Sequence, residues 1–159
     1  MALSVEYSAK GDPKVAETIL RSLPEWFGIE ESTKTYIEES KTLPMIIAKE
    51  NNEAVGFISL KIHSEYTAEI YVMGVLPTYH RQGIATKLLS KAENELKKRR
   101  VEFLQVKTIS PHHESQHYHI SRLFYKSNRF REVEVFPTLW GPSNPCLLMI
   151  KELRNVEKD

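Results

Sequence analysis

Six residues between an apolar, strand-like segment and a helix-like segment have the types needed to hold an anion. They are residues 80–85, HRQGIA, which follow the apolar segment 71–76 and Pro77. A helix that begins directly after a strand points its first free N–H groups, and the positive end of its dipole, at the intervening loop. Gly83 lets the backbone approach a ligand because it has no Cβ, and Arg81 can add charge-assisted hydrogen bonds. The segment therefore predicts a cradle for a pyrophosphate, and the alternative is a turn with ordinary surface charges.

Two common phosphate-binding motifs are absent from the chain, namely G-x-x-x-x-G-K-[ST] and a G-x-G-x-x-G after the first strand. The loop instead resembles the acetyl-CoA loop of the GNAT family of N-acetyltransferases, whose pattern is [Gln/Arg]-x-x-Gly-x-[Gly/Ala]. This pattern falls on His80, Gly83 and Ala85, with a histidine where glutamine or arginine is usual. We therefore expect the backbone of the loop, more than the His80 side chain, to hold the cofactor.

A second segment, residues 122–130 (RLFYKSNRF), resembles the family helix that ends in a tyrosine and is followed by Gly-Phe and a strand. Tyr125 takes the place of that tyrosine. Arg129 stands where glycine is usual, so we expect Asn128 to supply the left-handed turn. The asparagine that often precedes the tyrosine by seven or eight residues is absent, and Tyr118 stands at the first of these positions.

The resemblance implies that acetyl-CoA is a co-substrate and that backbone groups of the strand before the loop bind its pantetheine arm. Gly74, in mid-strand, fits such a close backbone approach or a bulge. The Val75 N–H is a candidate oxyanion donor. The implied cofactor contacts are Met73, Gly74, Val75, His80, Arg81, Gln82, Gly83, Ile84, Ala85, Thr86 and Tyr118.

Acetyl transfer from a thioester to an amine needs a base for the ammonium, stabilisation of the oxyanion and a proton for the departing thiolate. Glu69 precedes the loop by the distance at which histone-acetylating members of the family carry a glutamate, so the resemblance implies that Glu69 is the base. The alternatives are a glutamate that faces solvent, or the use of another group or water. Tyr125 is the candidate acid, because a phenol with a pKa of about 10 is protonated at neutral pH. Packing in the core is the alternative for its ring.

Both tryptophans lie in segments, LPEWFGIEES and PTLWGPSNP, that correspond to family regions flanking the acceptor. The resemblance makes Trp26, Phe27 and Trp140 candidate walls of an aromatic acceptor pocket, and Glu30 a candidate partner of the acceptor ammonium. Core or dimer-interface packing explains the tryptophans equally well, so a homodimer stays open. A solvated helix start is the alternative for Glu30 and its acidic neighbours.

Hydrophobic periodicity and turn residues predict the secondary structure. Asp12-Pro13 marks a helix start, Ser32 a helix cap and Asn51-Asn52-Glu53 a hairpin turn. The predicted strands span 3–8, 45–49, 54–62, 68–76, 102–109, 130–136 and 147–151, and the predicted helices span 13–23, the residues after Ser32, 84–100 and 115–127. This order predicts an α/β fold with a central mixed, mostly antiparallel sheet of about seven strands flanked by four helices. We expect one domain over residues 1–159, with the fold of the GNAT acyl-CoA N-acyltransferases that the chain resembles.

The composition gives the chain no global attraction to polyanions. With 22 Lys and Arg against 21 Asp and Glu, the net charge is +1, which disfavours nucleic-acid binding. The lone Cys146 excludes an intramolecular disulfide and a multi-cysteine metal site, and it fits packing better than nucleophilic attack. His113 and His117 have helical spacing, but a metal site would need further ligands, and we expect no metal. The chain shows no secretory signal and no membrane-spanning run, so we expect a cytoplasmic protein.

Together these observations predict an enzyme that moves acetyl from acetyl-CoA to the primary amine of a small molecule, by direct transfer in a ternary complex. Two alternatives stay open. One is acetylation of a peptide or protein amine, and the other is a non-catalytic acyl-CoA-binding sensor that kept the cradle. The presence of both Glu69 and Tyr125 favours the enzyme.

Overall fold

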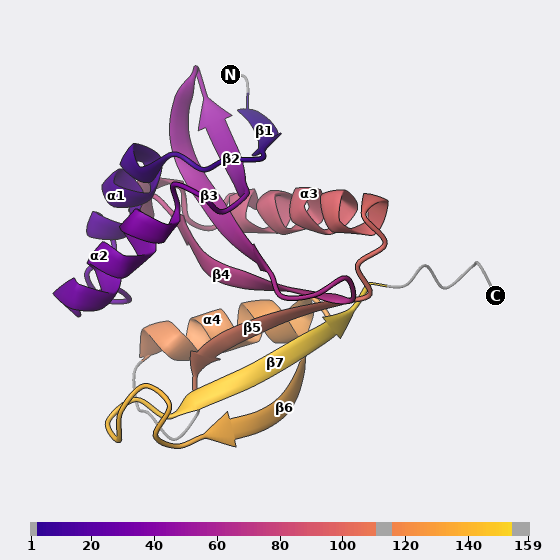
Figure 1. Ribbon diagram of the computed structural model, residues 1–159. Coiled ribbons are helices and arrows are strands. Elements are labelled where there is room, and N and C mark those ends of the chain that lie inside the picture. Colours follow the sequence, from indigo (N-terminus) through magenta and orange to yellow (C-terminus); the bar gives the residue numbers. More distant parts are fainter. Residues whose placement is uncertain (1–2, 111–115, 154–159) are drawn as a thin grey trace. The chain divides into compact units, whose positions relative to one another are not determined.

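The computed structural model describes residues 3–110 and 116–153 and shows a seven-stranded sheet (Figure 1) in the order β1-β2-β3-β4-β5-β7-β6. The strands are β1 (Leu3–Ser8), β2 (Met45–Glu50), β3 (Glu53–Ile62), β4 (Thr67–Val75), β5 (Phe103–Ile109), β6 (Arg131–Phe136) and β7 (Cys146–Glu152). The helices are α1 (Pro13–Arg21), α2 (Glu30–Glu39), α3 (Ile84–Lys98) and α4 (Gln116–Ser127), with a 3₁₀ helix, η1 (Pro77–Tyr79). The predicted fold class is confirmed. Within the described ranges, no helix is long and apolar enough to cross a membrane.

The chain divides into two compact units, which are described separately. The first comprises the residues up to Lys61 together with Ile70–Arg99, and the second comprises Ile62–Glu69 together with the chain from Arg100 onward. Strand β4 therefore begins in the second unit and ends in the first. That residues 1–159 form a single domain stays a prediction.

In the first unit, β1 pairs with β2 and β2 pairs with β3, both antiparallel. The turn between β2 and β3 holds Asn51 at φ 52° and Asn52 at φ 68°. A two-residue hairpin turn of type I′ requires such left-handed values at both central residues, and asparagine tolerates them. The predicted hairpin follows from this local chemistry.

The first two helices begin in different ways. Asp12 caps α1 as predicted, because its carboxylate accepts a backbone N–H of the first turn at 2.9 Å. Helix α2 begins at Glu30 after Ile29, with no side-chain cap, so the prediction of Ser32 as the cap was wrong. In place of a local cap, Glu30 forms an ion pair with Arg21 of α1 at 2.8 Å, and its negative charge complements the helix dipole.

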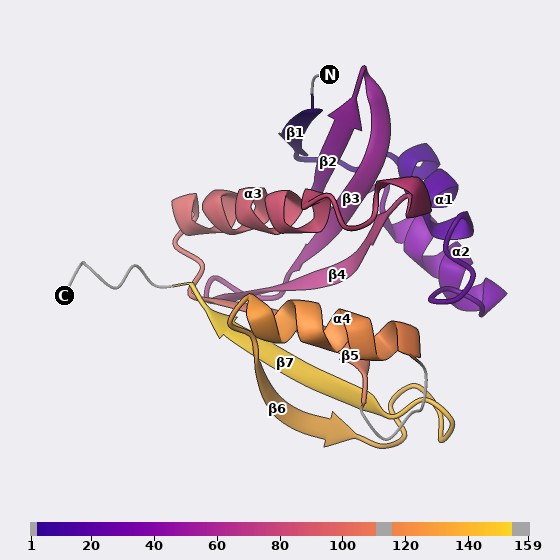
Figure 2. The same ribbon diagram turned by 180° about the vertical axis from the view of Figure 1, so that it is seen from behind.

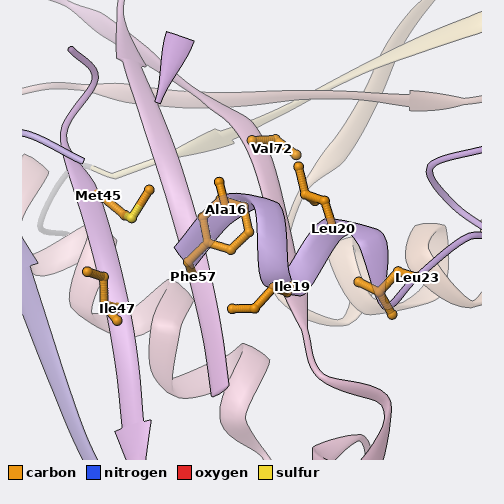
Figure 3. Packing of buried hydrophobic residues seen from close by; sticks show 8 residues of the cluster. All are labelled: Ala16, Ile19, Leu20, Leu23, Met45, Ile47, Phe57 and Val72. Carbon is orange, nitrogen blue, oxygen red and sulfur yellow. The ribbon is translucent and has the colours of Figure 1, made fainter. Parts of the chain in front are cut away.

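Helices α1 and α3 cover opposite faces of this part of the sheet. Phe57 packs with α1, whereas a Cβ at the neighbouring Gly56 would lie 3.1 Å from Leu88 of α3, and successive strand residues point to opposite faces. Figure 3 shows the apolar cluster on the α1 side, formed by Ala16, Ile19, Leu20, Leu23, Met45, Ile47, Phe57 and Val72. Gly74 lies beneath the same helix: a Cβ there would come within 3.0 Å of Leu23, so glycine permits the close approach of helix and strand.

In the second unit, the first residues of β4 run parallel to β5. Gln105 bonds to Thr67 at 3.1 Å and Lys107 bonds to Glu69 at 3.2 Å, so the partners advance together along both strands. A helical crossover, here α3, is the usual connection between parallel neighbours. The β5–β7 and β6–β7 pairs are antiparallel, which makes the sheet mixed, and α4 lies against one face of these strands (Figures 1 and 2).

Candidate active site

The segment between β4 and α3 has the backbone geometry of an anion-binding loop. Arg81 at φ 64° and Gly83 at φ 79° are both left-handed. Gly83 is the N-cap residue of α3 and no side chain caps that helix, so its first N–H groups lack partners within the helix. A Cβ at Gly83 would meet no heavy atom within 4 Å, so the space beside the loop is open. Free donors, a helix dipole and open approach are what a phosphate needs.

Side chains of the loop tie it to its surroundings. The Tyr79 hydroxyl donates to Glu50 at 2.7 Å, and this bond raises the pKa of Tyr79, with burial adding to the effect. The Gln82 amide donates to the Thr78 carbonyl at 3.2 Å. Of the predicted cofactor contacts here, Ile84 is buried, Ala85 is half-buried, and the exposed ones are His80, Arg81, Gln82, Gly83 and Thr86. Side-chain hydrogen bonds thus fix the backbone of the loop, while its surface stays exposed.

His80 is bonded to the end of β4. Its Nε2 lies 2.7 Å from the carbonyl oxygen of Val75, and because a carbonyl only accepts, Nε2 is the donor. The ring of Trp26 meets the imidazole edge-on, with centroids 5.9 Å apart. His80 thereby links the loop to the strand that carries the other predicted cofactor contacts, the half-buried Met73 and the buried Gly74 and Val75.

Glu69 belongs to a charged cluster in the second unit, formed with His63 and Lys107 and called here the Glu69 cluster. Glu69 is only 5% exposed, so the alternative of a solvent-facing glutamate was wrong. Its Oε1 bonds to His63 Nε2 at 2.7 Å, and both its oxygens lie 3.2 Å from Lys107 Nζ. The side chains of His63 and Lys107 are 35% and 27% exposed. The carboxylate is thus enclosed, while its two partners reach solvent.

Cys146 lies on the same face of the sheet as Lys107, because it pairs with Ile109, two residues farther along β5. The cysteine is fully buried. The pKa of the Cys146 thiol is raised to about 11. Burial is the main cause, Lys107 opposes the increase and Glu69 adds to it. A thiol that stays protonated at neutral pH is a poor nucleophile, which agrees with the packing role expected for this residue.

The end of α4 holds Tyr125. The N–H of Phe130 bonds to the Tyr125 carbonyl at 3.0 Å, and Arg129 adopts φ 74°, which together form a Schellman motif. The left-handed residue is therefore Arg129, and the prediction of Asn128 was wrong. The side-chain amide of Asn128 instead donates to a carbonyl of the preceding turn at 2.9 Å.

The ring of Tyr125 is buried and makes edge-to-face contacts with Phe124 and Phe130. The ring centroids lie 5.4 Å apart for Phe124 and 5.5 Å apart for Phe130. The contact with Phe130 is the apolar pair that commonly accompanies a Schellman motif. Burial raises the pKa of Tyr125, so the phenol is protonated throughout the neutral range. Its ring packs as the core alternative requires, and its hydroxyl keeps the proton that an acid needs. The acid role stays a prediction.

Two further polar residues lie on α4. Arg122 is buried, and its guanidinium donates to the Ile109 carbonyl at 2.7 Å, which ties α4 to the end of β5. Burial lowers the pKa of Arg122, but a guanidinium keeps its charge in proteins. Tyr118, a predicted cofactor contact one turn earlier, is half-buried, and this burial raises its pKa.

The histidine pair singled out for a metal cannot be compared with the fold, because His113 lies outside the described residues. His117 is half-buried in α4. Within residues 3–110 and 116–153, no three His, Cys, Asp or Glu side chains are arranged to hold a metal ion.

The predicted acceptor residues are divided between the two units. In the first, Trp26 and Phe27 are half-buried. The ring centroids of Phe27 and Tyr36 lie 6.0 Å apart, and those of Tyr36 and Tyr71 lie 5.3 Å apart. The first unit thus carries an aromatic group that extends from the α1–α2 connection to β4. In the second unit, Trp140 is 39% exposed.

Glu30 is already paired. Its two carboxylate oxygens accept from Nη1 and Nη2 of Arg21 at 2.8 and 3.0 Å. The bond to Arg21 is the main reason that the pKa of Glu30 is lowered. The pair is exposed, and the charge of Glu30 is balanced by this arginine.

The sequence profile of the acetyltransferase (GNAT) family matches residues 13–123, which include the loop and Glu69. The chain belongs to the GNAT family. This assignment confirms the resemblance inferred from the loop, and with it the prediction of an acetyl-CoA-dependent N-acetyltransferase. No curated protein sequence matches this GNAT chain.

Three solved structures illustrate the shared GNAT fold. The ribosomal-protein-S18-alanine N-acetyltransferase from Escherichia coli has a TM-score of 0.75 at 19% identity, over 97% of this chain and 96% of that one. A GNAT family acetyltransferase from Elizabethkingia anophelis with acetyl-CoA bound has a TM-score of 0.72 at 19% identity, over 94% of this chain and 97% of that one. The aminoglycoside 6′-N-acetyltransferase from Enterococcus faecium has a TM-score of 0.73 at 18% identity, over 96% of this chain and 98% of that one. Identities this low establish the fold alone.

Sequence analysis of this GNAT protein did not single out His63, Lys107 or Arg122. His63 and Lys107 lie 6 and 38 residues from Glu69, so no local motif joins the cluster. A parallel register between β4 and β5, inferred from the helical crossover, would have placed Lys107 beside Glu69. For Arg122, the only signal was its place one turn from Tyr118 and nearly one turn from Tyr125, on the same side of the helix.

Proposed function

We propose that this GNAT protein transfers acetyl from acetyl-CoA to the primary amine of a small molecule, directly and within a ternary complex. The observation that supports the proposal is the hydrogen bonding of the Glu69 carboxylate. Each carboxylate oxygen can accept two hydrogen bonds. Among the described residues, Oε1 has two partners, His63 and Lys107, whereas Oε2 has Lys107 alone. Oε2 therefore retains capacity to accept an N–H of an incoming ammonium.

The loop between β4 and α3 fits the pyrophosphate of acetyl-CoA. Its support is the uncapped helix start and the open space beside Gly83, together with the exposed Arg81 as a cationic donor. The GNAT structure from Elizabethkingia anophelis has acetyl-CoA bound. When bound, acetyl-CoA supplies the thioester carbonyl that is attacked and the thiolate that departs.

In the proposed reaction, Glu69 takes the proton that the acceptor ammonium must lose before its nitrogen can attack. A backbone N–H of β4 donates to the oxygen that becomes negative during the attack. The carbon–sulfur bond then breaks, and Tyr125 gives its phenolic proton to the departing thiolate. Solvent restores the Tyr125 proton and removes the one held by Glu69.

The choice of a small acceptor is supported by the half-buried aromatic group of Trp26, Phe27, Tyr36 and Tyr71. Aromatic walls bind small molecules through apolar area, with few polar contacts needed to orient them. A fold neighbour is named as an aminoglycoside 6′-N-acetyltransferase. Another is named as a ribosomal-protein-S18-alanine N-acetyltransferase, so the assay must also offer peptide amines.

The test is an amine panel in which release of the free CoA thiol is followed. The arms are aromatic and aliphatic monoamines, polyamines and aminoglycosides, and a peptide with an N-terminal alanine; reactions without an amine correct for hydrolysis. Turnover of a small amine supports the proposal. Turnover of the peptide alone assigns the acceptor to the peptide class. Acetyl-CoA binding by calorimetry without any turnover identifies a sensor and overturns the proposal.

A further inference from the structure

The proposed reaction uses Glu69 but neither of its two partners in the Glu69 cluster, Lys107 and His63. We propose that His63 is a positioning residue that orients Glu69 and, when protonated, prevents it from acting as the base. This inference rests on the proposed function, because it concerns the base of that reaction. It adds a residue from the turn between β3 and β4, outside the loop and outside α4.

The geometry makes His63 the more exposed of the two partners of Glu69. Its Nε2 lies 2.7 Å from Oε1 of Glu69, the shortest of the contacts that the carboxylate makes within the cluster. The imidazole side chain is 35% exposed, whereas that of Glu69 is 7% exposed. The backbone N–H of His63 donates to the Thr67 carbonyl at 3.0 Å, so the backbone that carries the ring is fixed. With Oε1 held by His63, Oε2 is the oxygen left to meet an acceptor.

The charge of the cluster depends on His63. With a neutral imidazole, the negative Glu69 and the positive Lys107 cancel; with an imidazolium, the cluster carries one net positive charge. A second cation beside Glu69 stabilises its ionised form and so weakens its tendency to take a proton. A positive cluster also repels an acceptor ammonium. Both effects act in the same direction, against catalysis at low pH.

Among the described side chains that face Glu69, His63 is the one imidazole. Imidazole is the side chain that ordinarily titrates between pH 5 and 8. Lys107, from β5, contributes the second charge that faces Glu69. Cys146, from β7, stays a thiol because burial raises its pKa to about 11. Gln105 and Thr67, bonded to each other at 3.1 Å beside the cluster, are uncharged.

The test compares kcat/KM across pH 5.5 to 8.5 for wild type, His63→Gln and His119→Gln, using one amine from the panel. Glutamine places an N–H donor close to the position of Nε2 but does not titrate. His119 is an exposed residue of α4 in the same unit and serves as the matched control. The titration of the amine itself is common to all three proteins and cancels in their ratios.

We expect the ratio of His63→Gln to wild type to rise by about five- to tenfold from pH 8 to pH 6, because only wild type loses its base to imidazolium formation. The ratio for His119→Gln should stay constant. A constant ratio for His63→Gln, whether near one or uniformly low, would limit His63 to a structural role and overturn the inference. If thermal unfolding shows that His63→Gln does not fold, His63→Asn, which also lacks the ring, replaces it. No turnover by wild type would overturn the proposed function as well, whereas turnover with a constant ratio overturns this inference alone.

Discussion

The two ends of β4 carry two different kinds of site. At its C-terminal end, in the first unit, the loop that leads to α3 offers backbone donors and an exposed surface, with left-handed residues at Arg81 and Gly83. At its N-terminal end, in the second unit, Glu69 is enclosed with His63 and Lys107, and charged side chains make the site. A site built from backbone tolerates changes of side chain but not of conformation. A site built from paired charges tolerates neither the loss nor the neutralisation of a partner.

The largest effect that this contrast predicts is on cofactor binding. Gly83→Glu should weaken acetyl-CoA binding by about a thousandfold or more, because a carboxylate about 4 Å from a phosphate charge costs about 4 kcal/mol at an effective dielectric constant of 20. Calorimetry measures it. Gly141→Glu is the matched control, since Gly141 is also left-handed with no heavy atom within 4 Å of a Cβ. Equal losses in both variants would show that backbone strain, and not the site, is responsible.

The corresponding change in the charged cluster should act on turnover. Glu69→Gln keeps the shape of the side chain but removes the base, so kcat should fall by about 10²- to 10⁴-fold while acetyl-CoA affinity stays similar. Steady-state kinetics and calorimetry on the same preparation separate the two quantities. Glu65→Gln, at an exposed position of the same turn, is the control. An unchanged kcat and pH profile in Glu69→Gln would remove Glu69 from the mechanism.

Tyr125→Phe should have a smaller effect, again on turnover. The variant keeps the ring contacts with Phe124 and Phe130 but lacks the acid, so kcat should fall by at least about tenfold. Because the pKa of Tyr125 is raised by burial, wild type holds this proton at every pH from 6 to 9, and the ratio of the two rates should not change across that range. Tyr66→Phe, at an exposed tyrosine of the second unit, is the control. Full turnover by Tyr125→Phe would leave core packing as the role of this ring.

The smallest effect belongs to the one loop side chain whose identity departs from the family pattern. His80 donates to the Val75 carbonyl and contacts Trp26, and a single hydrogen bond contributes about 1 kcal/mol. His80→Ala should therefore change acetyl-CoA affinity by no more than about fivefold, measured by calorimetry beside Gly83→Glu. A loss comparable to that of Gly83→Glu would mean that this imidazole, and not the backbone, holds the cofactor.

The sequence was informative where structure is local. The start of α1 at Asp12-Pro13, the hairpin at Asn51-Asn52 and the glycine of the loop each follow from a few adjacent residues, and all are present in the fold. These features depend on backbone dihedrals and caps that short motifs encode. The loop between β4 and α3 belongs to this class, which is why its pattern could be identified.

The errors arose where a contact outside the expected motif decides the local outcome. Ser32 was expected to cap α2, but the ion pair of Glu30 with Arg21 lies beyond the reach of a capping motif. Asn128 was expected in the left-handed turn, but Arg129 adopts it at a cost of about 1 kcal/mol, and the packing of Phe130 on Tyr125 compensates for that cost. The partners of Glu69 escaped notice for the same reason, because Lys107 becomes its neighbour only when two strands pair in parallel.

The loop between β4 and α3 is held by side-chain hydrogen bonds from Tyr79 to Glu50, from His80 to Val75 and from Gln82 to Thr78. If this loop binds acetyl-CoA as proposed, these bonds have a kinetic consequence. A loop that is already ordered loses little conformational entropy when its ligand arrives, and preorganisation of this kind strengthens binding by removing that cost. It also removes the need for a slow ordering step after encounter. We therefore expect acetyl-CoA to associate in a single exponential phase whose rate rises linearly with cofactor concentration. Loss of the Tyr79 tether should convert this into a rate that saturates.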